Sequence, residues 1–221
     1  MDVHRYFVVN KPYDMVSQFV SSHEVRVLGA LGFDFPPGTH PIGRLDQESE
    51  GLLILTTDKR VTRLLFQGEV PHRRTYLVKV KHVVSEESLA LLRAGVTIRV
   101  RGGGYYVTAP CEAERVGEPE GLFERASAEA AGAGDASAGG GGSAATSVAR
   151  DYTPVSWLRI TLTEGKFHQV RKMVAAIGHR CIRLVRVSIE ELTLEGLKAG
   201  EVREVGAAEF FEQLKIKVTY L

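Results

Sequence analysis

The segment with the highest density of potentially reactive side chains is residues 41–51, Pro-Ile-Gly-Arg-Leu-Asp-Gln-Glu-Ser-Glu-Gly. Asp46, Glu48 and Glu50 place three carboxylates within five residues, just ahead of an apolar run. Loops held by a rigid strand are where reactive groups are usually carried. Arg44, in the same turn, would favour the ionised form of Asp46, which a nucleophile needs. The alternative, a turn with solvated carboxylates, is the ordinary outcome for such a cluster.

A second cluster covers residues 164–173, Glu-Gly-Lys-Phe-His-Gln-Val-Arg-Lys-Met. It enters a helical stripe formed by Val170, Met173, Val174 and Ile177. Arg171 and Lys172 lie near the start of that helix, where the helix dipole is positive and added positive charge is unfavourable. An anionic partner, either a phosphate or the carboxylate of Asp46, would remove the conflict, although an ordinary surface pair fits the pattern too. His168 alone is more often a hydrogen-bonded structural residue than a catalyst.

The third candidate is Tyr76, which follows the basic residues His72, Arg73 and Arg74. A tyrosine in a strand usually belongs to the core. Beside basic residues it can instead stack on a base, as aromatic side chains do in the recognition of single-stranded RNA.

Strand and helix patterns alternate around these clusters. The sequence predicts a buried strand at 52–55, a half-exposed strand from 76 to 81, and a strand from 158 to 163. It predicts helices at 25–31 closed by Gly32, after Asp58, between Ser85 and Gly95, and from 170 to Gly178. Mixed strands with few long helices indicate an α+β protein with a largely antiparallel sheet.

Residues 117–150 differ in composition from the rest of the chain, being rich in Gly, Ala and Ser. Such a segment buries too little apolar surface to offset the entropy of ordering it. We therefore expect a flexible insertion between two strands, with no role assigned to it.

Composition allows one large domain or two small ones in 221 residues, with 44% hydrophobic and 25% charged residues. No apolar run approaches the roughly 20 residues of a membrane span, and the N-terminus has no secretory pattern. Cys111 and Cys181 form no metal-ligand or disulfide framework, so we expect a cytoplasmic protein.

The net charge of +1 conceals an uneven distribution. Residues 112–135 contain seven acidic and two basic residues, whereas residues 150–190 contain eight Arg or Lys and three Asp or Glu. A basic stretch is expected for a polyanion partner, but a solvated charged face fits equally well.

Taken together, the motifs resemble the RsuA/RluA superfamily of pseudouridine synthases. Residues 43–46 (Gly-Arg-Leu-Asp) followed by 50–53 (Glu-Gly-Leu-Leu) resemble its signature, and 10–12 (Asn-Lys-Pro) resemble its first motif. Residues 75–78 (Thr-Tyr-Leu-Val) resemble the second motif, 164–173 a motif of the RsuA branch, and 182–187 with 192–194 the closing strands. The resemblance covers about residues 6–205 apart from the insertion, and four motifs in the right order are highly specific.

The resemblance implies roles for individual residues. It makes Asp46 the nucleophile, Tyr76 the residue that packs on the uracil and assists proton transfer, and Arg171 the partner of Asp46, while Leu184 lines the uracil pocket. The remaining candidates for RNA contact are Lys11, Arg44, Arg73, Arg74, Lys166, His168, Gln169 and Lys172.

The resemblance also implies the pseudouridine synthase fold over residues 1–221: a central mixed, mostly antiparallel sheet flanked by helices, with two subdomains around a cleft. Because 10–12 lie at the start, no S4 RNA-binding domain is expected, which resembles the RluE type that acts on large-subunit (23S) ribosomal RNA. In this family the uracil N1–C1′ bond breaks and the base rejoins through C5, without metal or cofactor. We expect a monomer with no membrane partner.

Two other classes of function use the same residues. An RNA-binding module without turnover would need the basic surface but not Asp46. A glycosidase would pair Asp46 with Glu48 or Glu50, but the aromatic-rich sugar subsites expected of one are missing, with Trp157 the single tryptophan.

Overall fold

The computed structural model describes residues 4–68, 70–120 and 153–217. Most of the insertion predicted at 117–150 lies outside these ranges, so its predicted flexibility is not addressed. The strands that precede and follow it, β7 (Glu112–Val116) and β8 (Val155–Leu162), pair antiparallel with Val116 opposite Trp157.

The described residues form one nine-stranded sheet whose main path runs in the order β11-β1-β3-β9-β4-β8-β7, with β2 paired to β3 and β10 to β9. Its other strands are β1 (Tyr6–Lys11), β2 (His40–Ile42), β3 (Glu50–Thr56), β4 (Arg74–Lys81), β9 (Cys181–Ile189), β10 (Leu192–Thr193) and β11 (Val202–Val205). Within this sheet only the short β3–β9 pairing is parallel. A separate hairpin joins β5 (Thr97–Arg99) to β6 (Tyr105–Val107). The predicted α+β class and mixed, mostly antiparallel sheet are confirmed.

The described helices are α1 (Arg60–Phe66), α2 (Glu86–Ala94), α3 (Gln169–Ala176) and α4 (Ala207–Gln213). α2 begins and ends where the sequence predicts, because the Ser85 hydroxyl accepts the Ser88 N–H and Gly95 follows the last turn. The helix predicted at 25–31 is wrong in length, since only a 3₁₀ turn forms at Leu28–Leu31 before Gly32. The preceding backbone pairs with another segment instead, with Val16 N–H donating to Arg26 O.

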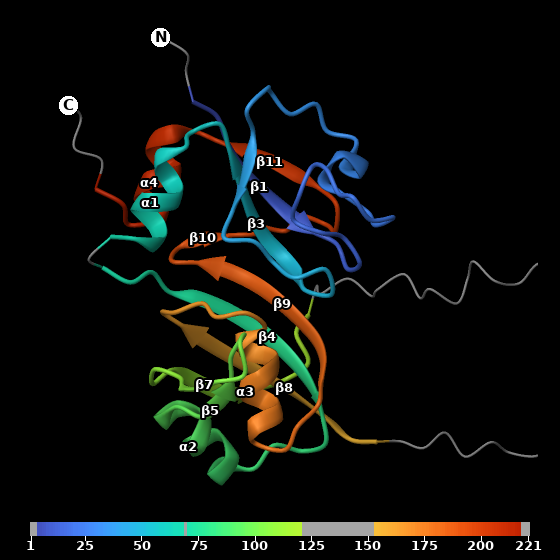
Figure 1. The fold of residues 1–221 in the computed structure, drawn as a ribbon, viewed down its shortest axis with the longest axis vertical. Helices are drawn as coiled ribbons and strands as arrows, with labels where there is room; N and C mark the ends of the chain where they lie inside the picture. Colours follow the sequence, from blue (N-terminus) through green and yellow to red (C-terminus); the bar gives the residue numbers. More distant parts are fainter. Residues whose placement is uncertain (1–3, 69, 121–152, 218–221) are drawn as a thin grey trace, which may run out of the picture.

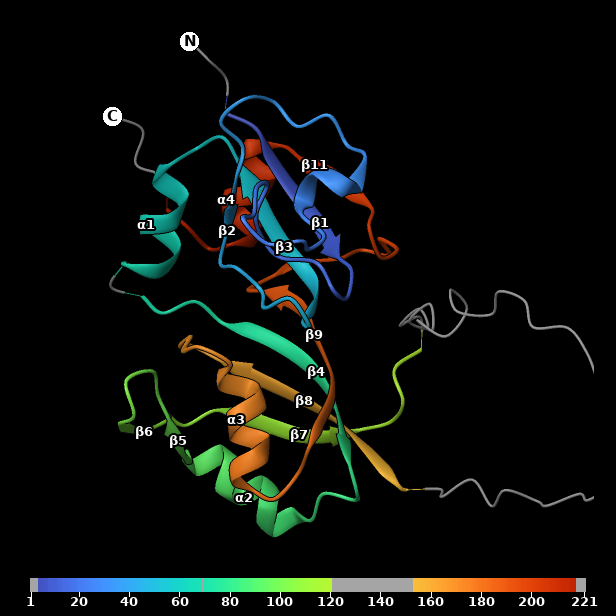
Figure 2. The same ribbon diagram turned by 45° about the vertical axis from the view of Figure 1, so that its right-hand side comes forward.

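The molecule has two halves that share this sheet (Figures 1 and 2). α1 and α4 lie with β1, β3 and β11 in one half, and α2 and α3 lie with β4, β7 and β8 in the other. Each half has its own buried apolar core, and the ring of Tyr76 packs against a cluster in each. The predicted two-part architecture is therefore present.

The two halves join where β3 meets β9. Gly51 lies opposite Arg186 in the parallel pairing, and its φ of +99° is one that glycine adopts easily. A Cβ there would lie 2.2 Å from the Arg186 carbonyl oxygen. Glycine is thus required for this approach, which fixes the loop preceding β3 against β9.

No helix in the described ranges has the length and apolarity to span a bilayer.

Candidate active site

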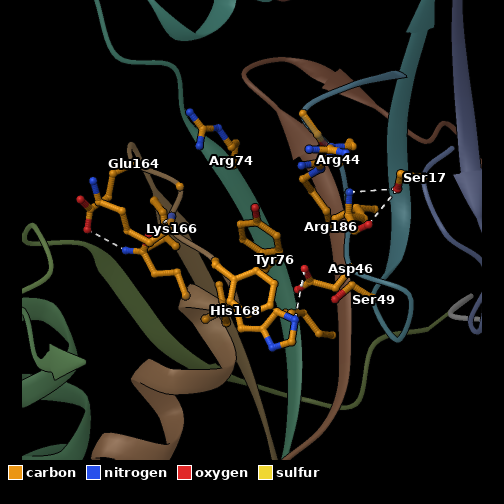
Figure 3. Close-up of a pocket in the computed structure, with 18 of the residues that line it drawn as sticks. Ser17, Arg44, Asp46, Ser49, Arg74, Tyr76, Glu164, Lys166, His168 and Arg186 are labelled. Atoms are coloured by element: carbon orange, nitrogen blue, oxygen red, sulfur yellow. Dashed lines mark hydrogen bonds and ion pairs between the residues drawn. The ribbon is translucent and has the colours of Figure 1, made fainter. Parts of the chain in front are cut away.

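A cleft of about 790 Å³ lies between the two halves (Figure 3). Its walls come from the 43–49 loop, β4, β9 and the turn that leads into α3. All twelve sequence candidates lie in the described residues. Eight of them line the cleft: Arg44, Asp46, Arg74, Tyr76, Lys166, His168, Gln169 and Leu184.

The other four candidates, Lys11, Arg73, Arg171 and Lys172, lie outside the cleft lining.

Asp46 lies on the loop between β2 and β3, with its side chain 31% exposed toward the cleft. The loop is held in two places near this residue. The Ser49 N–H donates to the Asp46 carbonyl at 3.0 Å, and the Ser17 hydroxyl donates to Leu45 O at 2.8 Å while accepting the Leu45 N–H at 3.1 Å. These bonds fix the backbone on both sides of the carboxylate.

Lys11 supports the same loop from inside the protein. Its side chain is fully buried, and the ammonium donates to Met15 O at 2.6 Å, Pro12 O at 2.9 Å and Gln47 O at 3.3 Å. Burial lowers the pKa of Lys11 to about 8. The expected RNA contact by Lys11 is corrected here, because an ammonium enclosed by carbonyl groups offers no charge at the surface.

His168 lies opposite Asp46 in the cleft, with its Nε2 3.4 Å from the Asp46 carboxylate (Figure 3). His168 precedes α3 with a left-handed φ of 55°, and its ring stacks on Phe167 with 3.9 Å between ring centres. The turn thus points the imidazole across the cleft at the carboxylate.

Arg171 reaches the same loop at a different residue. Its guanidinium donates to Glu48 O at 2.9 Å and lies 3.7 Å from the Glu48 carboxylate. The pair with Asp46 that the resemblance implies is not formed in this structure, because the guanidinium is bound two residues further along the loop. Arg171 therefore links α3 to the loop that carries Asp46, and its catalytic role stays a prediction.

Tyr76 and Leu184 line the cleft on the adjacent strands β4 and β9, where Leu184 is buried. Arg186, two residues beyond Leu184, is also a cleft residue and is 2% exposed. Its Nε donates to Leu52 O at 2.8 Å and its Nη2 to Gly43 O at 2.6 Å. Complete burial lowers the pKa of Arg186, while Tyr76, to which it is hydrogen-bonded, and Asp46 act in the opposite direction.

Sequence reasoning did not single out Arg186. The signal available was a charged residue inside the apolar strand pattern Leu-Val-Arg-Val at 184–187. A charged side chain is seldom fully buried without partners. An arginine at such a position therefore indicates either a structural partner or a ligand.

The remaining basic candidates differ in how they meet the cleft. Arg44 and Lys166 are exposed on its rim, whereas Arg73 lies outside it and pairs with Glu112 at 2.5 Å. Lys172 is outside the lining, with its Nζ 5.2 Å from the centre of the Phe167 ring. Arg44 and Lys166 are therefore the exposed basic candidates that line the cleft, and Lys166 Nζ also lies 4.7 Å from the centre of the Tyr106 ring.

Gln169 and Glu164 brace the turn before α3. Gln169 is buried, accepts the Lys166 N–H at 2.8 Å and donates to the Glu164 carboxylate at 2.6 Å. Burial acts to raise the pKa of Glu164, but hydrogen bonds from Tyr106, Ala109 and Gln169 lower it. Glu164 is thus an ionised structural carboxylate rather than an available acid.

The glycosidase alternative needs a second carboxylate in the cleft beside Asp46, and neither Glu48 nor Glu50 lines the cleft. Glu48 is exposed outside the cleft lining and pairs with Arg171. Glu50 is 5% exposed and ion-paired with Arg183 at 2.8 Å. Neither residue shares the cleft with Asp46, as an acid/base pair must. In the described ranges, no group of three His, Cys, Asp or Glu side chains could hold a metal ion.

The fold and the cleft agree with the comparison with known proteins. The model of the RNA pseudouridylate synthase family matches residues 5–176. The chain therefore belongs to the RNA pseudouridine synthases, a family of isomerases, and the predicted family is confirmed.

Individual relatives narrow the comparison. The ribosomal large subunit pseudouridine synthase E of Vibrio vulnificus is 34% identical over 200 residues, covering 90% of this chain and 74% of the relative. The ribosomal large subunit pseudouridine synthase B of Bacillus subtilis is 30% identical over 200 residues, which cover 90% of this chain and 67% of the relative. A crystal structure of a pseudouridylate synthase matches 97% of this chain and 75% of its own, with 24% identity and a TM-score of 0.69, which shows the shared fold.

Proposed function

We propose that this protein converts a uridine of large-subunit ribosomal RNA to pseudouridine, with Asp46 as the nucleophile. The relatives named for ribosomal large subunit pseudouridine synthases support the substrate. The observation that carries the assignment of Asp46 is its place in the cleft, partly exposed and next to Tyr76, while the neighbouring carboxylates of Glu48 and Glu50 are turned elsewhere.

The cleft suits a single extruded nucleotide. A base inside a stacked helix is out of reach, so an enzyme that reacts at the base draws the nucleotide out into a pocket. Tyr76 offers a ring face for the uracil, and Leu184 offers an apolar wall beside it. The ribose C1′ then faces Asp46, and the basic residues on the rim face the backbone.

The reaction exchanges one bond for another at C1′. The N1–C1′ bond breaks, the uracil turns, and C5 bonds to C1′. The hydrogen on C5 leaves as a proton and N1 takes up a proton, so the product is an isomer of the substrate. Asp46 either attacks C1′ or assists formation of a glycal, and both routes need its carboxylate ionised. The rest of this site positions the nucleotide and contributes charge.

The test is release of tritium from ribosomal RNA that carries 5-tritiated uridine. We expect release by the wild type and by Glu48→Gln, and none by Asp46→Asn, which removes the ionised oxygen but preserves shape. Circular dichroism should show all three proteins folded. Release by Asp46→Asn at the wild-type rate would refute the nucleophile.

A protein that binds RNA without turnover uses the same basic rim and gives a different result. It would bind ribosomal RNA and release no tritium from free RNA or from precursor subunits. We favour the isomerase, because Asp46 and Tyr76 line the same cleft. We also propose that it acts as a monomer in the cytoplasm.

A further inference from the structure

Two arginines in the cleft are buried without a carboxylate partner. Arg74 is 8% exposed and Arg186 is 2% exposed, and neither forms an ion pair with a carboxylate in the described part of the chain. Burying a charge without a counter-charge is costly. Burial lowers the pKa of Arg74 and the nearby charge of Arg186 adds to this, while Tyr76, Glu164 and Glu190 act in the opposite direction. Two like charges in one low-dielectric place are unfavourable until an anion joins them.

Arg74 is the less satisfied of the two. Its Nε is buried without a hydrogen-bond partner, and its guanidinium faces the Phe66 ring at 4.9 Å from the ring centre. Arg186, by contrast, is bound to the Leu52 and Gly43 carbonyl oxygens. Those neutral acceptors satisfy its N–H groups, and the charge of Asp46 favours the charged guanidinium without pairing directly with it in the described residues.

Glycines shape the space around both guanidinium groups. A Cβ on Gly165 would lie 2.7 Å from Arg74 Nη1. A Cβ on Gly43 would lie 2.7 Å from the Phe66 ring and 3.8 Å from Arg186 Nη1. Because any larger residue at these two glycines would collide with Arg74 or Phe66, the backbone fixes the positions of the side chains around it.

The arginines lie at one end of the cleft. In Figure 3, Arg74, Arg44 and Arg186 are on one side of Tyr76, and Asp46 is on the other with His168. All six side chains line the same cleft. A nucleotide whose ribose faces Asp46 would place a phosphate toward the arginines.

We propose that Arg74 and Arg186, with Arg44 at the rim, bind a phosphate of the RNA backbone that adjoins the target uridine. This proposal rests on the proposed function. Guanidinium groups recognise phosphate through paired, charge-assisted hydrogen bonds. Such a contact positions the nucleotide without reading its sequence, and it supplies the missing counter-charge.

The first test is thermal unfolding in inorganic phosphate and in chloride at equal ionic strength, with Arg74→Gln and, as the matched control, the exposed Arg63→Gln of α1. A ligand that binds the folded state raises the unfolding temperature. We expect phosphate to stabilise the wild type and Arg63→Gln, and to stabilise Arg74→Gln much less. Without phosphate, Arg74→Gln should be at least as stable as the wild type, since a buried charge has been removed.

An equal response of all three proteins to phosphate, or no response in any, would overturn the site. If Arg74→Gln does not fold, the exposed Arg44→Gln replaces it, and it should weaken the phosphate response. An unweakened response in Arg44→Gln would then count against the proposal.

The second test compares uridine with its 5′- and 3′-monophosphates by calorimetry. One of the two monophosphates should bind at least about tenfold more tightly than uridine, as the strength of hydrogen bonds to charged groups predicts. Arg74→Gln should remove this difference in affinity. Equal affinities for all three ligands would refute the phosphate site. Tritium release is independent: release without any phosphate preference refutes this site alone, whereas phosphate preference without release refutes the isomerase.

Discussion

Lys11 makes the stability of the protein depend on pH in a way that can be calculated. Its ammonium is fully buried and bound to three carbonyl oxygens, and burial lowers its pKa from 10.5 to about 8. Below pH 8 the amine is protonated in both the folded protein and the unfolded chain. Between pH 8 and 10.5 the unfolded chain keeps the proton and the folded protein has lost it.

A rise in pH destabilises the state that binds more protons, which here is the unfolded chain. The Lys11 contribution to the free energy of unfolding therefore increases between pH 8 and 10.5, by about 3 kcal/mol at 1.36 kcal/mol for each pKa unit. Most of this change should occur above pH 8. Lys11→Met keeps the length of the side chain and removes its titration.

The measurement is urea unfolding of the wild type and Lys11→Met at several pH values from 7 to 10.5. We expect the stability of the wild type relative to Lys11→Met to rise by about 3 kcal/mol across this interval. The exposed Lys59→Met serves as the control, and its difference from the wild type should stay nearly constant. A constant difference for Lys11→Met as well would show that burial does not perturb Lys11.

Two further predictions concern the loop that carries Asp46. Gly51→Ala should lower the free energy of unfolding by about 3 kcal/mol or more, because strain at positive φ adds to a clash with the Arg186 carbonyl; Gly200→Ala, at φ +90° with open space around it, should cost less in the same urea unfolding experiment. Arg171→Met should lower kcat about tenfold or more in the tritium assay, since it frees the loop at Glu48; an unchanged kcat would exclude this positioning role.

Much of the fold could be predicted because the local signals agree with the tertiary structure. β3 is buried along its whole length, as its apolar run at 52–55 predicts. α2 begins and ends where the sequence predicts. The turn at 28–31 could not be predicted in the same way. Its flanking backbone bonds to residues distant in the sequence, and a local pattern contains no information about such partners.

The candidate site was predictable in its residues but not in its contacts. Asp46 and Tyr76 were found from their motifs, and both line the cleft. Lys11 belongs to a different motif from Asp46 and Tyr76. Its burial depends on the carbonyl groups of Met15 and Gln47, which the folded chain places around its ammonium. The same holds for Arg171, whose partner is decided by the exact path of the loop.

Arg186 explains why the motif around Asp46 contains two glycines. Its guanidinium binds the Gly43 carbonyl oxygen, and its own backbone lies against Gly51, where any Cβ would collide. One residue of β9 therefore contacts both ends of the loop that presents Asp46. The Gly-Arg-Leu-Asp and Glu-Gly pattern thus specifies a loop clamped at both ends as much as it specifies a reactive carboxylate, and a clamped loop is what holds that carboxylate in place during a reaction.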